Sequence, residues 1–433
     1  MKYYSTNNPQ LTVDLETAVR QGLPADKGLY MPQTIPRLPA GFFSRLPGMT
    51  LPQIGFEVLR PYVQGGVPDE DLRLICEEAF TFPAPLSKLD RGLYSLELYH
   101  GPTLAFKDFG ARFMARMLGY FNAHTQHQNT VLVATSGDTG SAVAHGFYAV
   151  ENVNVVILYP QGKVSDLQER QMTTLGKNIH TLAVAGSFDD CQRLVKTAFV
   201  DEELVTALGL TSANSINIAR LLPQMLYYFY AYGQVEDKQK PVVFSVPSGN
   251  YGNLTAGVLA RRMGLPVAHF IAAANANAIV PAYLATGEFK PRPSVETISN
   301  AMDVGNPSNF VRLQALFGHS VAKFRAFVSG YSYSDDQTRE TIAQAQQKYN
   351  YVLDPHGAIG CRALQAYKQG ADVTGVFLET AHPVKFRQEV EAVTGKAIAV
   401  PAPIQETLHK DKLITQCGAD YAAFKAQLWR LLS

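Results

Sequence analysis

Short apolar runs alternate with helical patterns along the chain after residue 94. Runs typical of buried strands occur at 130–134, 153–158, 179–184, 242–246, 268–273 and 373–378. Helical spacing follows the turn at 135–140 through residue 150, and recurs at 166–175, 189–203 and 253–263. This alternation is typical of parallel sheets in an α/β architecture, where ligands bind beyond the carboxyl ends of the strands. The pattern therefore predicts one functional rim formed by the turns at 135–140, 247–253 and 379–381.

The first part of the chain has a different pattern. It combines a short amphipathic helix expected at 11–21, an extended stretch spaced by prolines, and an acidic-started helix expected at 69–80. We therefore predict a separate N-terminal unit over residues 1–95. Residues 96–433 would form the catalytic region, with a smaller α/β subdomain at about 112–215 and a larger one from the remainder.

Composition narrows the classes of function. The chain has 433 residues, 46% of them hydrophobic, and a formal net charge of +1, so no strong field favours nucleic acid or an anionic membrane. No apolar run approaches the length of a membrane span, and the N-terminal residues lack the apolar core of a signal peptide. Four isolated cysteines predict neither a metal site nor a disulfide framework. We expect a cytoplasmic protein.

Lys107 lies within an otherwise apolar and aromatic run, residues 101–110, with Asp108 directly after it. Lysine is strongly hydrated, and desolvation lowers the pKa of its amine and makes it a usable nucleophile or Schiff-base former. The alternative is a surface lysine that extends its stem along apolar neighbours. The run alone leaves both interpretations open.

Two turns between a strand and a helix are candidate anion sites. Residues 248–253 (SGNYGN) would let several backbone N–H groups converge at a helix N-terminus. This turn is neither a Walker motif nor GxGxxG, so it does not imply a nucleotide. Residues 135–139 (TSGDT) offer hydroxyls and backbone donors suited to a carboxylate. Simple helix capping is the alternative, and the local pattern favours it. Thr380 would add one hydroxyl at the same rim.

These features occur in the order found in pyridoxal-phosphate enzymes of the tryptophan-synthase-β type. Within that group, residues 100–109 (HGPTLAFKDF), 134–140 (ATSGDTG) and 212–217 (SANSIN) resemble the threonine synthase family. The distinct N-terminal unit and residues 380–383 (TAHP) agree with its longer class. The resemblance implies two parallel-sheet domains with a separate N-terminal unit, and pyridoxal 5'-phosphate as cofactor.

The resemblance also implies the roles of individual residues. Lys107 would carry the cofactor as a Schiff base and shuttle protons. The cofactor's phosphate would lie on Gly249, Asn250, Tyr251, Gly252 and Asn253, and its pyridine nitrogen would meet Thr380. The substrate carboxylate and the cofactor's oxygen side would be held by Thr135, Ser136, Asp138 and Thr139. The wider group often has Asn in place of Asp138, so the partner of this carboxylate is an open question.

A second anion site would select the substrate. Residues Asn214, Ser215, Asn217 and Arg220 supply amides, a hydroxyl and a guanidinium at a helix start, which suits a phosphate monoester. The resemblance implies that the phosphate of O-phospho-L-homoserine binds there, to be converted with water into L-threonine and phosphate. The alternative is an ordinary helix cap with an exposed arginine. His356 and His382 are candidate proton carriers, although a structural role is favoured for both.

Other functions are compatible with parts of this pattern. A related lyase could stop at elimination and release 2-oxobutyrate, and a pyridoxal-phosphate dehydratase would have no use for the second anion site. A non-catalytic carrier of the cofactor or a phospho-ligand binding module is the alternative from another class, whereas a P-loop kinase is disfavoured because GxxxxGK[ST] is absent. We expect a small-molecule substrate, no metal, and a monomer or homodimer.

Overall fold

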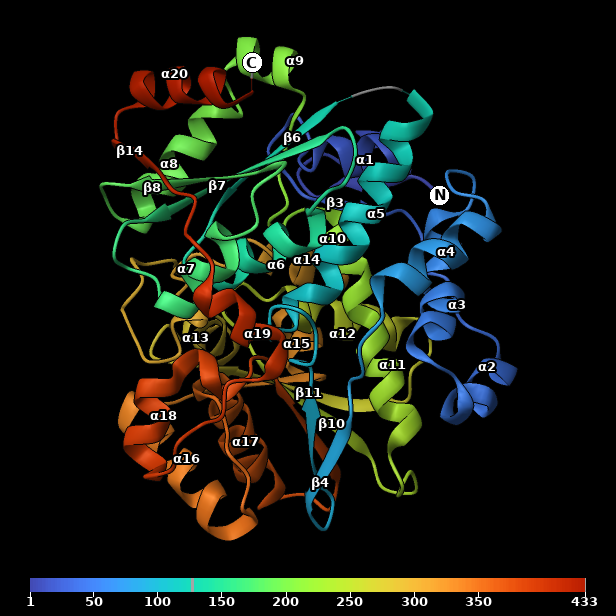
Figure 1. Ribbon diagram of the computed structural model, residues 1–433. Helices are drawn as coiled ribbons and strands as arrows, with labels where there is room; N and C mark the ends of the chain where they lie inside the picture. The colour runs from blue at the N-terminus through green and yellow to red at the C-terminus, as the bar shows by residue number, and fades with distance from the viewer. Residues whose placement is uncertain (126–127, 433) are drawn as a thin grey trace.

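A six-stranded sheet forms the larger α/β unit of the computed structural model, which describes residues 1–125 and 128–432 (Figure 1). Its strand order is β12 (Val328–Ser332), β11 (Val267–Ala274), β10 (Val242–Pro247), β13 (Thr374–Glu379), β5 (Leu93–Glu97) and β4 (Leu86–Asp90). All neighbouring strands are parallel except β4 and β5. Three of the apolar runs predicted as buried strands, 242–246, 268–273 and 373–378, thus pair in this sheet as β10, β11 and β13, with β10 between the other two.

A five-stranded parallel sheet forms the smaller unit. Its order is β14 (Thr415–Cys417), β8 (Ile179–Val184), β7 (Val153–Pro160), β6 (Asn129–Ala134) and β9 (Leu210–Thr211). The edge strand β14 comes from the C-terminal part of the chain. The helix that follows it, α20 (Tyr421–Leu432), packs Phe424 and Leu428 into the same apolar cluster as Cys191 and Leu194 of α8 (Phe188–Ala198). The prediction assigned this C-terminal segment to the larger unit, and the pairing of β14 with β8 corrects it.

The N-terminal region is a small antiparallel sheet with helices. β1 (Tyr3–Ser5) lies between β2 (Thr12–Val13) and β3 (Tyr30–Pro32). The helices here are α1 (Leu15–Gln21), α2 (Ala40–Arg45), α3 (Leu51–Val63) and α4 (Asp69–Ala79). Because β4 and β5 belong to the six-stranded sheet, this unit ends before Leu86 and not at residue 95.

The remaining helices cover the two sheets. Those that position the site are α5 (Lys107–Thr125), α6 (Asp138–Phe147), α10 (Ile218–Leu221), α12 (Gly252–Arg262) and α17 (Pro355–Lys368), with short 3₁₀ turns η3 (Asn300–Met302) and η4 (Pro383–Phe386). The others are α7 (Asp166–Thr173), α9 (Glu202–Leu208), α11 (Met225–Gln234), α13 (Ile279–Thr286), α14 (Phe310–Leu316), α15 (Val321–Arg325), α16 (Asp335–Tyr349), α18 (Arg387–Thr394) and α19 (Ala402–Gln405).

Helix boundaries differ from the sequence prediction where a side chain caps the backbone. The helix expected at 11–21 begins at Leu15, because Asp14 accepts a hydrogen bond from the Thr17 N–H and the preceding residues form β2. The single helix expected at 189–203 is two helices, α8 and α9, because Asp201 caps the second one. Local capping therefore overrides the apolar period at these points.

One continuous apolar core joins the N-terminal region to the helices beneath the site. Phe80 stacks on Phe113 and Phe109 of α5 at centroid distances of 6.1 and 6.2 Å, and Phe82 meets Phe109 edge-on at 4.8 Å. The helix that begins at Lys107 is therefore anchored against the end of the N-terminal region.

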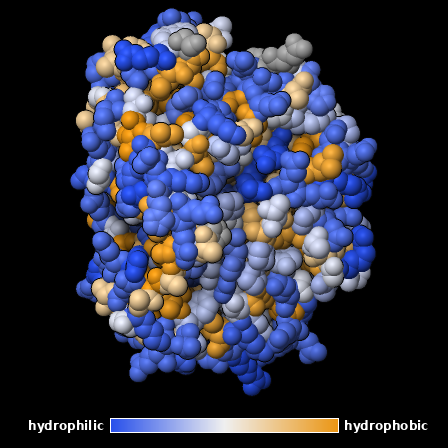
Figure 2. Space-filling model, viewed as in Figure 1, coloured by the Kyte–Doolittle hydropathy of each residue, from blue (hydrophilic) through white to orange (hydrophobic). Residues whose placement is uncertain are grey.

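The face drawn in Figure 2 is mostly hydrophilic, with hydrophobic residues in scattered groups. Among the residues that the structure describes, no helix is both long and apolar enough to cross a membrane.

Candidate active site

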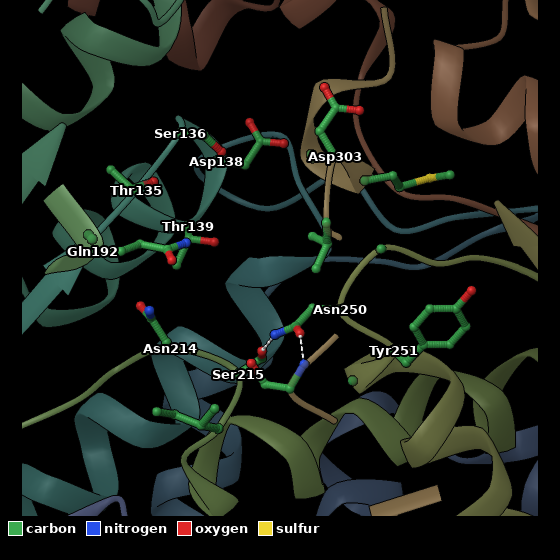
Figure 3. Close-up of a pocket in the computed structure, with 18 of the residues that line it drawn as sticks. Thr135, Ser136, Asp138, Thr139, Gln192, Asn214, Ser215, Asn250, Tyr251 and Asp303 are labelled. Atoms are coloured by element: carbon green, nitrogen blue, oxygen red, sulfur yellow. Dashed lines mark hydrogen bonds between the residues drawn. The ribbon is translucent and has the colours of Figure 1, made fainter. Parts of the chain in front are cut away.

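A cavity of about 550 Å³ lies where the carboxyl ends of β6, β10 and β13 face one another. Fourteen of the residues predicted for the site line it: Lys107, Thr135, Ser136, Asp138, Thr139, Asn214, Ser215, Arg220, Gly249, Asn250, Tyr251, Gly252, Asn253 and Thr380. In Figure 3 the 135–139 turn lies on one side of this space and Asn250 and Tyr251 on another, with Asn214 and Ser215 between them. The predicted turns thus meet at one cavity, but from two different sheets.

Backbone pairing sets the position of Lys107. The segment before it runs beside the end of β13: Phe106 N–H donates to the Thr380 carbonyl (2.9 Å), His382 N–H donates to the Leu104 carbonyl (3.0 Å), and Ala105 forms a bridge with Ala381. Lys107 then begins α5, with 18% of its side chain exposed. This pairing fixes the backbone of both residues, and the side chains of Lys107 and Thr380 both line the cavity.

Burial lowers the pKa of Lys107 from its ordinary value. The Asp138 carboxylate, 4.0 Å from the amine, opposes this shift, whereas the positive charges of Lys385 and Arg220 add to it. A desolvated amine with two cationic neighbours is activated as a nucleophile. The surface-lysine alternative is wrong for this residue.

Asp138 has a partner that the sequence prediction left open. Its carboxylate accepts from the buried Lys385 amine at 2.7 Å and from the Gln168 amide at 2.9 Å. Burial alone would raise the pKa of Asp138, but the ammonium groups of Lys385 and Lys107 outweigh it and hold the pKa well below its usual range. Asp138 is therefore ionised and acts as the counterion of the buried Lys385 and the partly buried Lys107.

The turn at 248–253 forms a tightly fixed cup. A Cβ on Gly249 would lie 2.6 Å from the Met302 Cα, so only glycine allows this close approach of η3. Tyr251 takes the left-handed conformation (φ 62°) immediately before α12, which turns the backbone toward the helix N-terminus. Asn253 donates to the Pro247 carbonyl at 2.7 Å and closes the turn.

Asn250 joins this cup to the second predicted anion site. Its amide nitrogen donates to the Ser215 hydroxyl at 2.5 Å, and its amide oxygen accepts from the Ser308 N–H at 2.5 Å (Figure 3). The hydroxyl of Ser215 also accepts from Asn309 at 3.2 Å. The cup and the segment 214–220 are therefore neighbouring parts of one wall.

Arg220 is buried, with 3% of its surface exposed, and lines the cavity. One of its terminal nitrogens donates to the Ala213 carbonyl, whereas its Nε has no partner within the described residues, and neither has the nearby Asn214 Oδ1. Burial lowers the pKa of Arg220 to about 10, which still leaves it charged at neutral pH. The exposed-arginine alternative is thus wrong for this residue.

Asn217 is the one predicted site residue that the structure places elsewhere. Its amide oxygen accepts from the Ala219 N–H at 3.0 Å, and its amide nitrogen donates to the carbonyls of Val19 and Ser212. It is fully buried and does not line the cavity. Asn217 is an N-cap of α10, because its short side chain returns to the adjacent backbone.

Within the 135–139 turn, the hydroxyl of Thr135 is used by the turn itself. It accepts from the N–H groups of Gly137 (3.0 Å) and Gly140 (2.9 Å). Ser136 and Thr139 are partly exposed at the cavity wall. The capping interpretation therefore fits the Thr135 side chain, whereas the other two hydroxyls stay available.

The two histidines considered as proton carriers lie in different surroundings. His356 lines the cavity, and its Nδ1 lies 2.5 Å from the Asp354 carboxylate. His382 caps η4 by accepting from the Val384 N–H and is not a cavity-lining residue. Burial, aided by the nearby His100, lowers the pKa of His382 to about 4, so the ring is neutral at physiological pH.

Three residues that shape the cavity were not predicted from the sequence: Lys385, Asp303 and Arg312. Lys385 lies only two residues beyond the TAHP motif, and its position there was the one available signal. Asp303, directly after η3, lines the cavity, and burial raises its pKa to about 6. Arg312 donates to the carbonyls of Tyr30, Ser215 and Ile216 and fixes the segment 214–217 from behind. Nothing in the local sequence of Asp303 or Arg312 indicates these contacts.

These residues fit pyridoxal phosphate. The glycine-tight cup before α12 presents a helix N-terminus to an anion, and the desolvated Lys107 amine opens into the same cavity. The unpartnered Nε of Arg220 offers a second, separate anion contact.

Comparisons with known proteins agree with this site. Residues 80–378 match the profile of the pyridoxal-phosphate dependent enzymes, 2–80 that of the threonine synthase N terminus, and 357–428 that of the threonine synthase C-terminal region. The chain is 46% identical to threonine synthase of Haemophilus influenzae, covering 99% of both proteins, and 44% identical to that of Escherichia coli, covering 98% of both.

Solved structures give the same result. The crystal structure of Escherichia coli threonine synthase superposes with a TM-score of 0.92 at 42% identity, covering 100% of both chains. The PLP-bound threonine synthase of Brucella melitensis superposes with a TM-score of 0.93 at 36% identity, covering 99% of both. Maize serine racemase, with a TM-score of 0.55 at 15% identity over 72% of this chain and 92% of its own, shares the fold alone. The chain belongs to the threonine synthase family of pyridoxal-phosphate-dependent enzymes.

Proposed function

We propose that this protein converts O-phospho-L-homoserine and water into L-threonine and phosphate. The observation that carries the proposal is the pairing of two anion sites in one cavity: the cup at 248–253 beside the desolvated Lys107 amine, and the buried Arg220 with no carboxylate hydrogen-bonded to it. A cofactor phosphate uses one anion site, and a phosphorylated amino acid needs the other.

Lys107 is the proposed point of covalent attachment, as a Schiff base with the cofactor's aldehyde. Gly249, Asn250, Tyr251 and Gly252 would hold the cofactor's phosphate through their backbone, and Asn253 keeps the turn closed. Thr380 would meet the pyridine nitrogen. When bound, pyridoxal phosphate supplies an electron sink for the carbon that loses its proton.

The 136–139 turn and Arg220 would orient the substrate from opposite ends. Backbone donors at the start of α6 and the hydroxyls of Ser136 and Thr139 suit its carboxylate, whereas Arg220, Asn214 and Ser215 suit its phosphate. Asp138, held by Lys385, would keep a negative charge beside the Lys107 amine. That charge stabilises the ammonium form after the amine has taken a proton from the substrate.

An assay of both products tests this proposal. The purified protein with pyridoxal phosphate and O-phospho-L-homoserine is expected to release phosphate and threonine in a 1:1 ratio. Release of phosphate with 2-oxobutyrate would identify a phospho-lyase, and turnover of serine or threonine alone would identify a dehydratase. Binding of the cofactor without turnover would identify a carrier.

We further propose that the protein acts in the cytoplasm as a monomer or homodimer. The four cysteines are buried and unbridged, which suits a reducing compartment. Fractionation and sedimentation analysis of the native protein test both points.

A further inference from the structure

Three acid and imidazole groups form a chain behind the Thr380 end of the cavity. Glu379, the last residue of β13, accepts the Asp354 N–H at 2.7 Å. Asp354 caps α17 by accepting the N–H groups of His356 (2.8 Å) and Gly357 (3.2 Å), and the same carboxylate lies 2.5 Å from His356 Nδ1. All three residues are buried, with at most 2% of their surface exposed. The imidazole is therefore fixed through one of its two nitrogens.

The other nitrogen of this ring, Nε2, has no partner. It is buried, its residue lines the cavity, and no described side chain or backbone group lies within hydrogen-bonding distance. The ring packs edge-on against Phe386 at 4.9 Å, which limits its rotation. An unpaired buried polar atom destabilises the folded protein, so its retention beside a binding cavity needs a reason.

Asp354 determines what Nε2 can do. A carboxylate at Nδ1 favours the tautomer that carries its proton on Nδ1, and this leaves Nε2 as an acceptor that can take up a further proton. The start of α17 packs tightly against Glu379: a Cβ on Gly357 would lie within 2.3 Å of the Glu379 carboxyl carbon. The histidine therefore presents a proton-accepting atom in a fixed orientation.

His356 and Thr380 both line the cavity. Thr380 directly follows Glu379, which is linked to His356 through Asp354, so the hydrogen-bonded chain is continuous with the strand end that carries the Thr380 hydroxyl. Among the described residues, Asp303, directly after η3, interacts electrostatically with His356, whereas Glu379 on β13 and His382 before η4 interact with Asp354.

We propose that His356, oriented by Asp354 and Glu379, is a cofactor-binding residue whose Nε2 shares a proton with the pyridine-nitrogen end of pyridoxal phosphate together with Thr380. This inference rests on the placement of the cofactor under the proposed function. A neutral hydroxyl alone would not hold the pyridine nitrogen protonated. A histidine backed by a carboxylate can take up a proton from water on Nε2, and the resulting imidazolium would share that proton with this end of the cofactor.

Cofactor uptake by the apo-protein tests the inference without relying on turnover. H356N keeps an amide near the position of Nδ1, for Asp354, and removes Nε2, whereas H356Q keeps a polar atom near Nε2. We expect H356N to bind pyridoxal phosphate about tenfold more weakly, the loss of one hydrogen bond in a buried site, and H356Q to recover part of this affinity. The wild-type visible absorption, titrated from about pH 5 to 9, should show a proton-linked change that H356N lacks.

A double-mutant cycle adds a readout that a merely structural histidine would not move. If Thr380 and His356 serve the same end of the cofactor, the effects of H356N and T380V on the dissociation constant should be strongly non-additive. His269, a part-buried histidine whose Nε2 lies 2.8 Å from the Ser329 hydroxyl on the same sheet, is the matched control, and H269N should bind the cofactor as the wild type does.

Two results would overturn the inference: wild-type affinity and an unchanged pH titration in H356N, or strictly additive effects in the cycle. Should H356N fail to fold, D354N keeps the ring and its helix cap but removes the negative charge. It should move the absorbance change to lower pH, and an unmoved change counts against the inference. The two proposals can fail separately. If H356N binds the cofactor as tightly as the wild type does, and the wild type forms threonine, only the inference about His356 is overturned. If the wild type binds pyridoxal phosphate but forms no threonine, the proposed function is contradicted, and the affinities of H356N and the wild type can still be compared.

Discussion

Single side chains set the chemistry of the cavity through their charges. The partly buried Lys107 and the buried Lys385 share Asp138 as counterion, at 4.0 and 2.7 Å. The lysine, the hydroxyls and the glycine turn could be predicted from the sequence because they form local motifs with a chemical meaning. Lys385 could not, because its partner lies far away along the chain: Asp138 is 247 positions before Lys385. Asp303 could not, because its partners Thr297 and Asn275 lie in irregular segments that show no periodic pattern. Asn217 was misassigned because a helix cap and a ligand contact use the same residue types.

K107A is expected to abolish covalent attachment of the cofactor while the protein stays folded, because Asp138 keeps Lys385 as a partner. Turnover should fall by at least about 10²–10⁴-fold, the usual contribution of a positioned acid–base group. Mass spectrometry after borohydride reduction measures the attachment, and thermal unfolding checks the fold. K323A, which changes an exposed lysine on α15, should behave as the wild type. A reducible adduct that persists in K107A would show that another amine carries the cofactor.

R220A is expected to raise the KM for O-phospho-L-homoserine about 30-fold or more, because removing one member of a buried charge pair costs about 2–5 kcal/mol. Binding of a non-phosphorylated analogue such as L-2-aminobutyrate should change little. Spectroscopic titration of both ligands gives the comparison. Equal weakening of the two would assign Arg220 to the structure of the wall and not to the phosphate.

E379Q is expected to gain stability over the wild type as the pH rises. Burial, together with the charge of Asp354, raises the pKa of Glu379 well above its ordinary value, so the folded protein keeps a proton that the unfolded chain releases above about pH 4.3. The wild type should therefore lose up to about 1.4 kcal/mol of unfolding free energy per pH unit above that point, a loss that the neutral glutamine avoids. Urea unfolding of both proteins from pH 4 to 8 measures the difference, and parallel curves would show that Glu379 is ionised in the folded state.

At the scale of the elements, the strands bring these residues together because their carboxyl ends meet at the cavity. The strands β6, β10 and β13 were predicted to within two residues, because buried strands are short apolar runs between polar turns. The N-terminal helices α2 and α3, the helices α13–α16 and the edge strands β12 and β14 were not predicted. Edge strands are half exposed and short, as the three residues of β14 show, so their pattern does not differ from that of a loop.

G249A is expected to weaken cofactor binding about tenfold or more and to cost about 1–3 kcal/mol of stability, because its Cβ would lie 2.6 Å from the Met302 Cα and must displace η3. Fluorescence titration of the apo-protein with pyridoxal phosphate measures the affinity. G370A adds the same methyl group where no heavy atom lies within 4 Å and should leave it unchanged. An unaffected G249A would mean that η3 moves aside at no cost and is not part of the cup.

At the scale of the whole molecule, the N-terminal unit is linked by hydrogen bonds to the wall of the cavity. The buried Arg312 of α14 donates to the Tyr30 carbonyl of β3 at 2.9 Å and to the carbonyls of Ser215 and Ile216 at 3.2 and 2.6 Å. Burial lowers the pKa of Arg312 to about 9, and it stays charged without a carboxylate among its hydrogen-bond acceptors. One side chain thus joins the first sheet of the chain to the segment proposed to bind the substrate phosphate.

R312M is expected to lower the unfolding free energy by about 3 kcal/mol or more, because several buried carbonyls lose their donor at about 1–3 kcal/mol each. Since the 214–217 segment loosens with it, the KM for O-phospho-L-homoserine should also rise. Urea unfolding and steady-state kinetics measure the two effects. R325M removes a guanidinium that donates to carbonyls at the surface and should cost far less. Lost stability with an unchanged KM would separate the N-terminal unit from substrate binding.

The pairing of β14 with β8 affects how the protein is made. Because Thr415–Cys417 completes the edge of a sheet whose other strands lie between residues 129 and 211, that sheet stays unfinished while the ribosome synthesises the intervening two hundred residues. During this interval its open edge and the apolar surface that α20 later covers are exposed to other chains. Chaperone demand should therefore concentrate on this half of the protein, and it ends only when the last helix has docked.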